Sequence, residues 1–145
     1  MKHHTLDALR STAGVHAKFQ DFTTTRETRL LRWAELLEKE PDRRLRTLPE
    51  TEYQPTSVRD RMRCVDSPMA LAFEDAVFRA EGLKDDTYGE AKRFFELTDW
   101  QLHGFVCSCH SGATVRSGSA AKSLRRAARP SPGLLAMLWD ALLLR

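Results

Sequence analysis

Three four-residue segments that precede apolar residues with helical spacing have the pattern of a helix capping box, in which Ser or Thr is followed three residues later by Glu or Gln. They are Thr24–Glu27, Thr87–Glu90 and Thr98–Gln101. In such a box the two side chains accept hydrogen bonds from amides that a helix start otherwise leaves unpaired. We therefore expect a helix to begin at each position, and the fold to be all-α or nearly all-α, a compact small helical domain.

Apolar residues with helical spacing follow the first two boxes. After the first box they recur at i, i+3, i+4 and i+7, which is typical of one buried helix face, and Pro41 ends the run. The residues of this face are Leu30, Trp33, Ala34 and Leu37, and those after the second box are Tyr88, Ala91, Phe94 and Phe95.

The stretch between these helices is less regular. Two prolines and no sustained period indicate a connection over residues 43–55, followed by a short helix near residues 57–63. Residues 69–73 are compatible with a short strand or with the first turn of a buried helix. Residues 74–81 have a helical pattern, with Gly82 placed to end it.

At 145 residues the chain has the length of one domain. We divide it into an N-terminal arm, residues 1–23, a helical domain, residues 24–129, and an apolar C-terminal helix, residues 130–145. Within the last, Leu134–Leu144 is apolar except for Asp140 and spans about 16 Å, too little for a bilayer core. This helix is expected to dock into its own domain, into a second copy of the chain or at a membrane surface.

The third capping box begins a helix expected over Asp99–Ser111, with Gly112 as the residue that ends it. This helix contains two histidines and two of the three cysteines of the chain. On a helical wheel four residues form the stripe that faces the core. They are Leu102, Phe105, Val106 and Cys109.

His103, Cys107 and His110 lie on a narrower arc beside that stripe, and imidazole nitrogen and thiolate are ligands that zinc prefers. A zinc site would need completion, for instance by Cys64. One helix supplies too few convergent ligands, and no second C-x-x-C or H-x-x-x-H occurs, so we expect no cofactor, with zinc as the alternative.

A catalytic Cys107 is disfavoured because the thiol falls in the second half of its helix, where the helix dipole opposes thiolate formation. The sequence contains no P-loop, G-x-G-x-x-G, G-x-S-x-G or H-E-x-x-H motif. We therefore expect a protein that is not an enzyme.

The segment GEAKRFFELTDWQLHGFVCSCHSGATVRSG, residues 89–118, is similar to a family of small uncharacterised bacterial proteins. The similarity covers roughly residues 68–128 and is strongest from Lys92 to His110. The family has no assigned activity, so the resemblance implies no particular function.

Positive charge is concentrated in the last third of the chain. Six Lys or Arg and one acid, Asp140, follow Trp100, a net charge of +5, so the first 99 residues carry −2 of the total +3. A helix expected to begin near Ser117 and to end at Pro130 carries most of this charge, with no acid in it. The cations are Arg116, Lys122, Arg125, Arg126 and Arg129, and the apolar seam of the helix is Ala121, Leu124 and Ala128.

The order of helix, short glycine-containing turn over residues 111–115 and basic helix has the outline of a helix-turn-helix. Because arginine matches phosphate geometry, these cations are candidate contacts to DNA or RNA.

The N-terminal segment MKHHTLDALRSTAGV lacks the apolar core of a secretory signal, and no window reaches the roughly 18 apolar residues of a membrane span. An odd number of cysteines, three, argues against a disulfide framework. We therefore expect a cytoplasmic protein without a transmembrane span.

The function most consistent with these features is that of a non-enzymatic regulatory or assembly protein, associated with nucleic acid through its basic helix. One alternative is a protein–protein interaction module without nucleic acid. Independently of that choice, a second copy of the chain, contacted through Leu134–Leu144, is a candidate partner. A second alternative is a metal- or redox-responsive protein that uses His103, Cys107 and His110.

Overall fold

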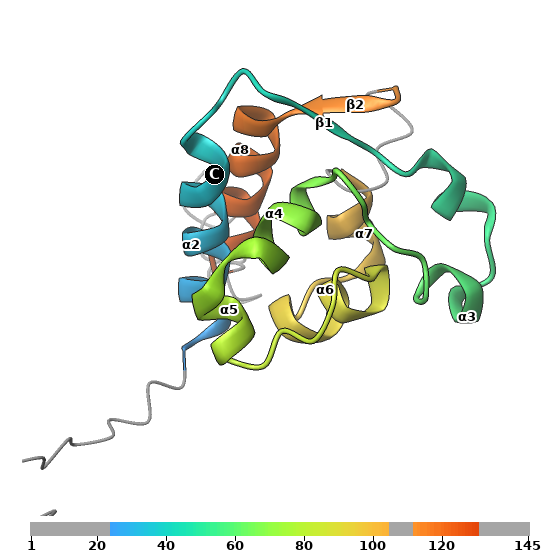
Figure 1. Cartoon of the computed structure of the whole chain (residues 1–145), viewed down its shortest axis with the longest axis horizontal. Helices are drawn as coiled ribbons and strands as arrows, with labels where there is room; N and C mark the ends of the chain where they lie inside the picture. The colour runs from blue at the N-terminus through green and yellow to red at the C-terminus, as the bar shows by residue number, and fades with distance from the viewer. Residues whose placement is uncertain (1–23, 105–111, 131–145) are drawn as a thin grey trace, which may run out of the picture.

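The computed structural model describes residues 24–104 and 112–130, and these form a mostly helical domain (Figure 1). The expectation of a nearly all-α fold is confirmed. The helices are α2 (Arg26–Glu38), α3 (Thr56–Arg59), α4 (Pro68–Glu74), α5 (Ala76–Ala80), α6 (Tyr88–Phe95), α7 (Asp99–Leu102) and α8 (Ser117–Ala128), with a 3-10 turn η1 (Pro49–Tyr53). Two strands complete the fold, β1 (Arg44–Arg46) and β2 (Thr114–Arg116).

Within these two ranges of the chain, none of the helices has both the length and the apolar character that crossing a membrane requires.

Helix α2 begins one residue later than its predicted capping box. The N-cap is Thr25, whose hydroxyl oxygen accepts from the Thr28 amide. Thr24 instead donates to Glu81 at 2.6 Å. Either of two consecutive threonines can serve as an N-cap residue, and here Thr24 is engaged by the hydrogen bond to Glu81. The prediction of a capping box formed by Thr24 and Glu27 is therefore wrong.

The predicted apolar face of α2 is buried, as its period indicated. Trp33 is its largest side chain and has no exposed surface. Its Nε1 donates to the Pro68 carbonyl at 2.9 Å, and its ring stacks on Phe95 with centroids 4.3 Å apart. The core of the domain therefore lies where α2 meets α4 and α6.

Helices α2 and α8 run side by side and antiparallel (Figure 1). The start of α8 is fixed by the segment that ends α2: the Ser117 hydroxyl donates to the Leu37 carbonyl at 2.6 Å, and the Gly118 amide to the Pro41 carbonyl at 2.9 Å. A Cβ on Gly118 would lie 3.2 Å from the Pro41 carbonyl oxygen, so glycine permits this approach. The predicted apolar seam is confirmed, with Ala120, Ala121, Leu124 and Ala128 buried.

Strands β1 and β2 pair antiparallel above these two helices (Figure 1). Arg44 lies opposite Arg116, and Leu45 opposite Val115. The predicted connection over residues 43–55 therefore contains β1. Strand β2 begins within the predicted turn over residues 111–115. Strands of three residues show no alternation long enough to recognise in a sequence. The helix-turn-helix outline is not confirmed, because a paired strand stands between the described part of α7 and α8.

Residues 69–73, for which the sequence allowed either a strand or a helix, are helical. They belong to α4, and the Ser67 side chain caps this helix by accepting a hydrogen bond from the Met69 amide.

Residues 74–81 do not form the one helix that the sequence had indicated. Asp75 has an extended backbone, with ψ at 120°, and its carboxylate accepts from the Val77 and Phe78 amides to begin α5. Gly82 follows α5 with a φ of 102°, which supports the prediction that a glycine ends this helix.

The two remaining capping boxes differ from each other. Thr98 and Gln101 form the complete reciprocal box at the start of α7. Thr87 caps α6, but the Glu90 side chain accepts from the Lys84 amide instead of returning to the N-cap amide.

The prediction that the helix after Thr98 continues to Ser111 extends outside the described residues. The N-terminal arm, residues 1–23, and the apolar helix at residues 134–144 also lie outside them.

Candidate functional site

Four basic side chains, three on α8 and one at its C-cap, line one hollow of about 310 Å³ on the surface. They are spaced i, i+3, i+4 and i+7, which groups them on one side of the helix, away from its buried seam. We call this feature the basic hollow; its residues are Lys122, Arg125, Arg126 and Arg129.

Arg125 has a counter-charge that the sequence analysis did not anticipate. Its Nε and Nη2 donate to the two carboxylate oxygens of Glu38 on α2, at 2.7 and 2.6 Å. This bidentate hydrogen bonding lowers the pKa of Glu38 and raises that of Arg125. The basic helix contains no acid of its own, and its acidic partner was not predictable from the local pattern because Glu38 lies 87 residues away in sequence.

Lys122, Arg126 and Arg129 form no ion pair within the part of the chain that the structure describes. Like charges at i, i+3 and i, i+4 destabilise a helix by a few tenths of a kcal/mol each. Glu38 offsets one of the four charges through its ion pair, and Glu35 also attracts Arg125. The basic hollow thus retains a positive potential that an anion would relieve.

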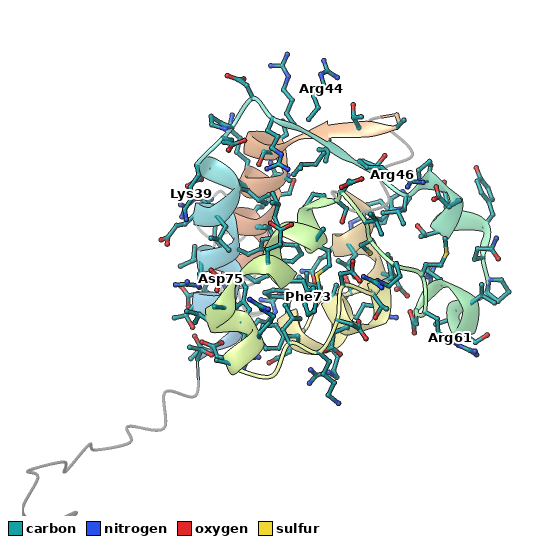
Figure 2. The ribbon with its side chains drawn as sticks, in the orientation of Figure 1. Lys39, Arg44, Arg46, Arg61, Phe73 and Asp75 are labelled. Carbon is teal, nitrogen blue, oxygen red and sulfur yellow. The ribbon has the colours of Figure 1, made fainter. Side chains whose placement is uncertain are left out.

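Arg116 is not part of the basic hollow. It lies at the other end of α8, on β2, where it pairs in register with Arg44, and both are exposed. Figure 2 shows Arg44 at the edge of the molecule formed by the two strands. The five predicted cations therefore form two separate groups.

Other arginines serve the fold itself. Arg26 donates to the Ala127 carbonyl at 3.0 Å and to the Glu96 carbonyl at 3.1 Å, and Arg29 donates to the Phe94 carbonyl at 2.9 Å. These carbonyls belong to the last turns of α6 and α8, which lack intrahelical donors. These arginines are used in helix packing, whereas the side chains of the basic hollow line an open surface.

The residues of the zinc alternative are only partly described. Cys64 is completely buried, with its Sγ 4.0 Å from the Met62 carbonyl oxygen, and His103 is half-buried. Cys107 and His110 lie outside the described residues. Among residues 24–104 and 112–130, no group of three or more His, Cys, Asp or Glu side chains is arranged to hold a metal ion. The zinc alternative stays a prediction, which metal analysis of the purified protein tests.

The structure adds an aromatic feature that the sequence analysis did not select. Trp100 on α7 is 81% exposed, and its ring lies nearly parallel to that of His103, with centroids 6.3 Å apart. Nearby, the Arg59 guanidinium lies over the Tyr88 ring and pairs with Asp99 at 3.1 Å. The sequence indicated this exposure only through the position of Trp100, which lies outside the predicted apolar stripe of its helix.

Comparison of the chain with known protein families, with curated proteins and with solved structures finds no significant match.

Proposed function

We propose that the protein binds nucleic acid through the basic hollow and acts as a non-enzymatic regulatory or assembly protein. The observation that carries the proposal is the composition of that hollow, whose lining consists of four cationic side chains on one helix face. The proposal includes a cytoplasmic location, DNA or RNA as the partner, and self-association through Leu134–Leu144.

Charge and geometry support a phosphate backbone as the ligand. Three of the four cations are guanidinium groups, whose planar set of donors matches phosphate oxygens. The first and last cations are seven residues apart, which corresponds to about 10 Å along the helix. A polyanion with regularly spaced charges contacts such a row at several points, and each contact displaces counterions from the backbone.

Two backbone amides at the start of α8 are engaged within the fold. The Ser117 amide donates to the Arg43 carbonyl at 2.8 Å and the Gly118 amide to the Pro41 carbonyl. We therefore assign the binding proposed for α8 to its side chains.

The test is the affinity for a fluorescently labelled oligonucleotide at low salt, measured by anisotropy. Replacing Lys122 and Arg126 together by Ala should weaken binding at least about tenfold, since a hydrogen bond to a charged group contributes about 1.5–3 kcal/mol. Alanine is the better helix former, so α8 should persist. The matched control is Arg61→Ala, which removes an exposed cation just beyond α3, at the opposite end of the molecule from α8 (Figure 2).

Absence of binding by the wild-type protein, or equal loss in the Arg61 variant, would contradict the proposal. Polyglutamate provides the second arm of the experiment. If it displaces the oligonucleotide at equal charge concentration, the basic hollow selects acidic chains in general, and the protein-interaction alternative takes the place of this proposal.

A further inference from the structure

The exposed indole of Trp100 is fixed close to the basic hollow. The capping box of Thr98 and Gln101 sets the first turn of α7, and Trp100 is the second residue of that turn. Tryptophan has a large apolar surface, yet this side chain is 81% exposed, whereas Trp33 has no exposed surface. His103, one turn later, lies nearly parallel to the indole, with an interplanar angle of 17°.

A second hollow, of about 260 Å³, connects the indole to the basic hollow. Both Trp100 and Arg126 line it, and Arg126 also lines the basic hollow. Ser123 and Gln101 line the same surface, so α7 and α8 each contribute to it. An aromatic face and a row of cations are therefore neighbours on one continuous surface.

The indole also borders a third hollow, of about 270 Å³, whose walls include Tyr88, His103 and Arg59 together with the carboxylates of Glu52 and Asp99. The two hollows meet at Trp100, which lines both. A planar group stacked on the indole would occupy this junction, which Arg126 links to the basic hollow.

We infer that this surface binds single-stranded nucleic acid, with a base stacked on Trp100 while the flanking phosphates contact the basic hollow. The inference rests on the proposed function and specifies its ligand class. Single-strand sites combine a positively charged track with aromatic side chains, because an unpaired base exposes its flat face. In a duplex those faces are covered by neighbouring base pairs, so the indole has no partner there.

The test compares three labelled ligands of equal charge: an oligothymidylate of about 12 nucleotides, an abasic oligomer of the same length, and a duplex whose two strands are joined by a non-nucleotide linker so that it stays paired at low salt. Stacking on one aromatic side chain contributes about 5- to 150-fold in affinity per base. The wild-type protein should therefore bind the oligothymidylate more tightly than the abasic oligomer by a factor in that range, and more tightly than the duplex.

Trp100→Ala should abolish the preference for the oligothymidylate and leave affinity for the abasic oligomer unchanged. Trp100→Phe should restore part of the preference. Because the side chain is mostly exposed, both variants should keep the melting temperature of the wild type. Bound thymidylate should also quench tryptophan emission in the wild-type protein, and the Trp100→Phe variant should lose that quenching.

The outcomes separate the inference from the proposed function. If no ligand binds at low salt, the abasic oligomer included, the proposed function fails. If the abasic oligomer and the oligothymidylate bind equally, or the duplex binds best, or Trp100→Ala weakens both single-stranded ligands alike, then phosphate binding stands and the stacking site is wrong.

Discussion

At the scale of single residues, the charged side chains of this protein are distinguished by their partners. Arg26 and Arg29 donate to carbonyls at helix ends, whereas Arg32 pairs with Asp75 at 2.9 Å. Arg126 and Lys122 have no ion pair within the described ranges. The first group stabilises the packing of helices, and the second is available to a ligand.

Asp75 connects this electrostatic network to stability. It lies at the junction of α4 and α5 (Figure 2). Burial would raise the pKa of its carboxyl group, but hydrogen bonds from Arg32 and from the Phe78 and Val77 amides outweigh burial, so the pKa is lowered overall. A carboxylate with a depressed pKa in the folded state contributes stability above its ordinary pKa of 3.8 and loses it as the pH falls.

We therefore predict that the melting temperature of the wild-type protein falls between about pH 5 and about pH 2, and that Asp75→Asn reduces this fall. Asparagine keeps Oδ1 as the acceptor for the α5 amides, but it loses the charge and replaces Oδ2, the acceptor for Arg32 Nη2, with an NH2 donor. At about pH 7 the variant should be less stable by about 1 kcal/mol, because solvent screens the pair on the partly exposed side of Arg32. Thermal melts followed by circular dichroism measure both effects.

The control for this prediction is Asp42→Asn, which removes an exposed carboxylate that has no ion pair among the described residues. It should leave the pH profile of the wild type unchanged. An Asp75→Asn profile that matches the wild type at every pH would show that this network does not contribute to stability.

At the scale of helices and strands, close backbone contact sets how α6 meets the chain segment after α3. The Gly89 amide donates to the Asp60 carbonyl at 2.9 Å. A Cβ on Gly89 would lie 2.8 Å from that oxygen and 2.9 Å from the Asp60 Cβ, closer than atoms can pack. The segments can approach this closely only because residue 89 has no side chain.

Gly89→Ala should therefore destabilise the protein by about 1–3 kcal/mol, although alanine is the better helix former by about 1 kcal/mol. Steric overlap with backbone outweighs propensity here, since a carbonyl cannot move aside as a flexible side chain can. Gly104→Ala is the matched control, because nothing lies within 4 Å of the added Cβ. Urea unfolding compares the two; equal midpoints would refute the close contact.

Helices with a long apolar period or a capping box were predictable from sequence, and the short strands were not. The face of α2 that contains Trp33 repeats over two turns, so its burial follows from the period. By contrast, β1 and β2 have three residues each and lie 70 positions apart, and their pairing depends on α2 and α8 bringing them together. The end of α4 at Asp75 was also not predictable from the apolar period. There the Asp75 carboxylate accepts hydrogen bonds from the first amides of α5, so the two helices are separate.

At the scale of the whole molecule, the antiparallel packing of α2 and α8 creates the candidate site. It turns the apolar seam of α8 inward and the four cations outward, and it brings Glu38 against Arg125. The cationic face of α8 was predictable from its spacing. Its acidic partner and its proximity to Trp100 were not, since both arise from contacts between helices distant in sequence.

The salt dependence of binding tests the central claim most directly, because it counts the phosphates that the protein neutralises. On a single-stranded oligonucleotide each contact contributes about −0.7 to the slope of log K against log salt. Lys122, Arg126 and Arg129 should therefore give a slope of about −2, and Arg126→Ala a slope of about −1.4. Glu38→Gln releases Arg125 from its pair and should steepen the slope to about −2.8. A wild-type slope near zero, or one that neither substitution changes, would contradict the account.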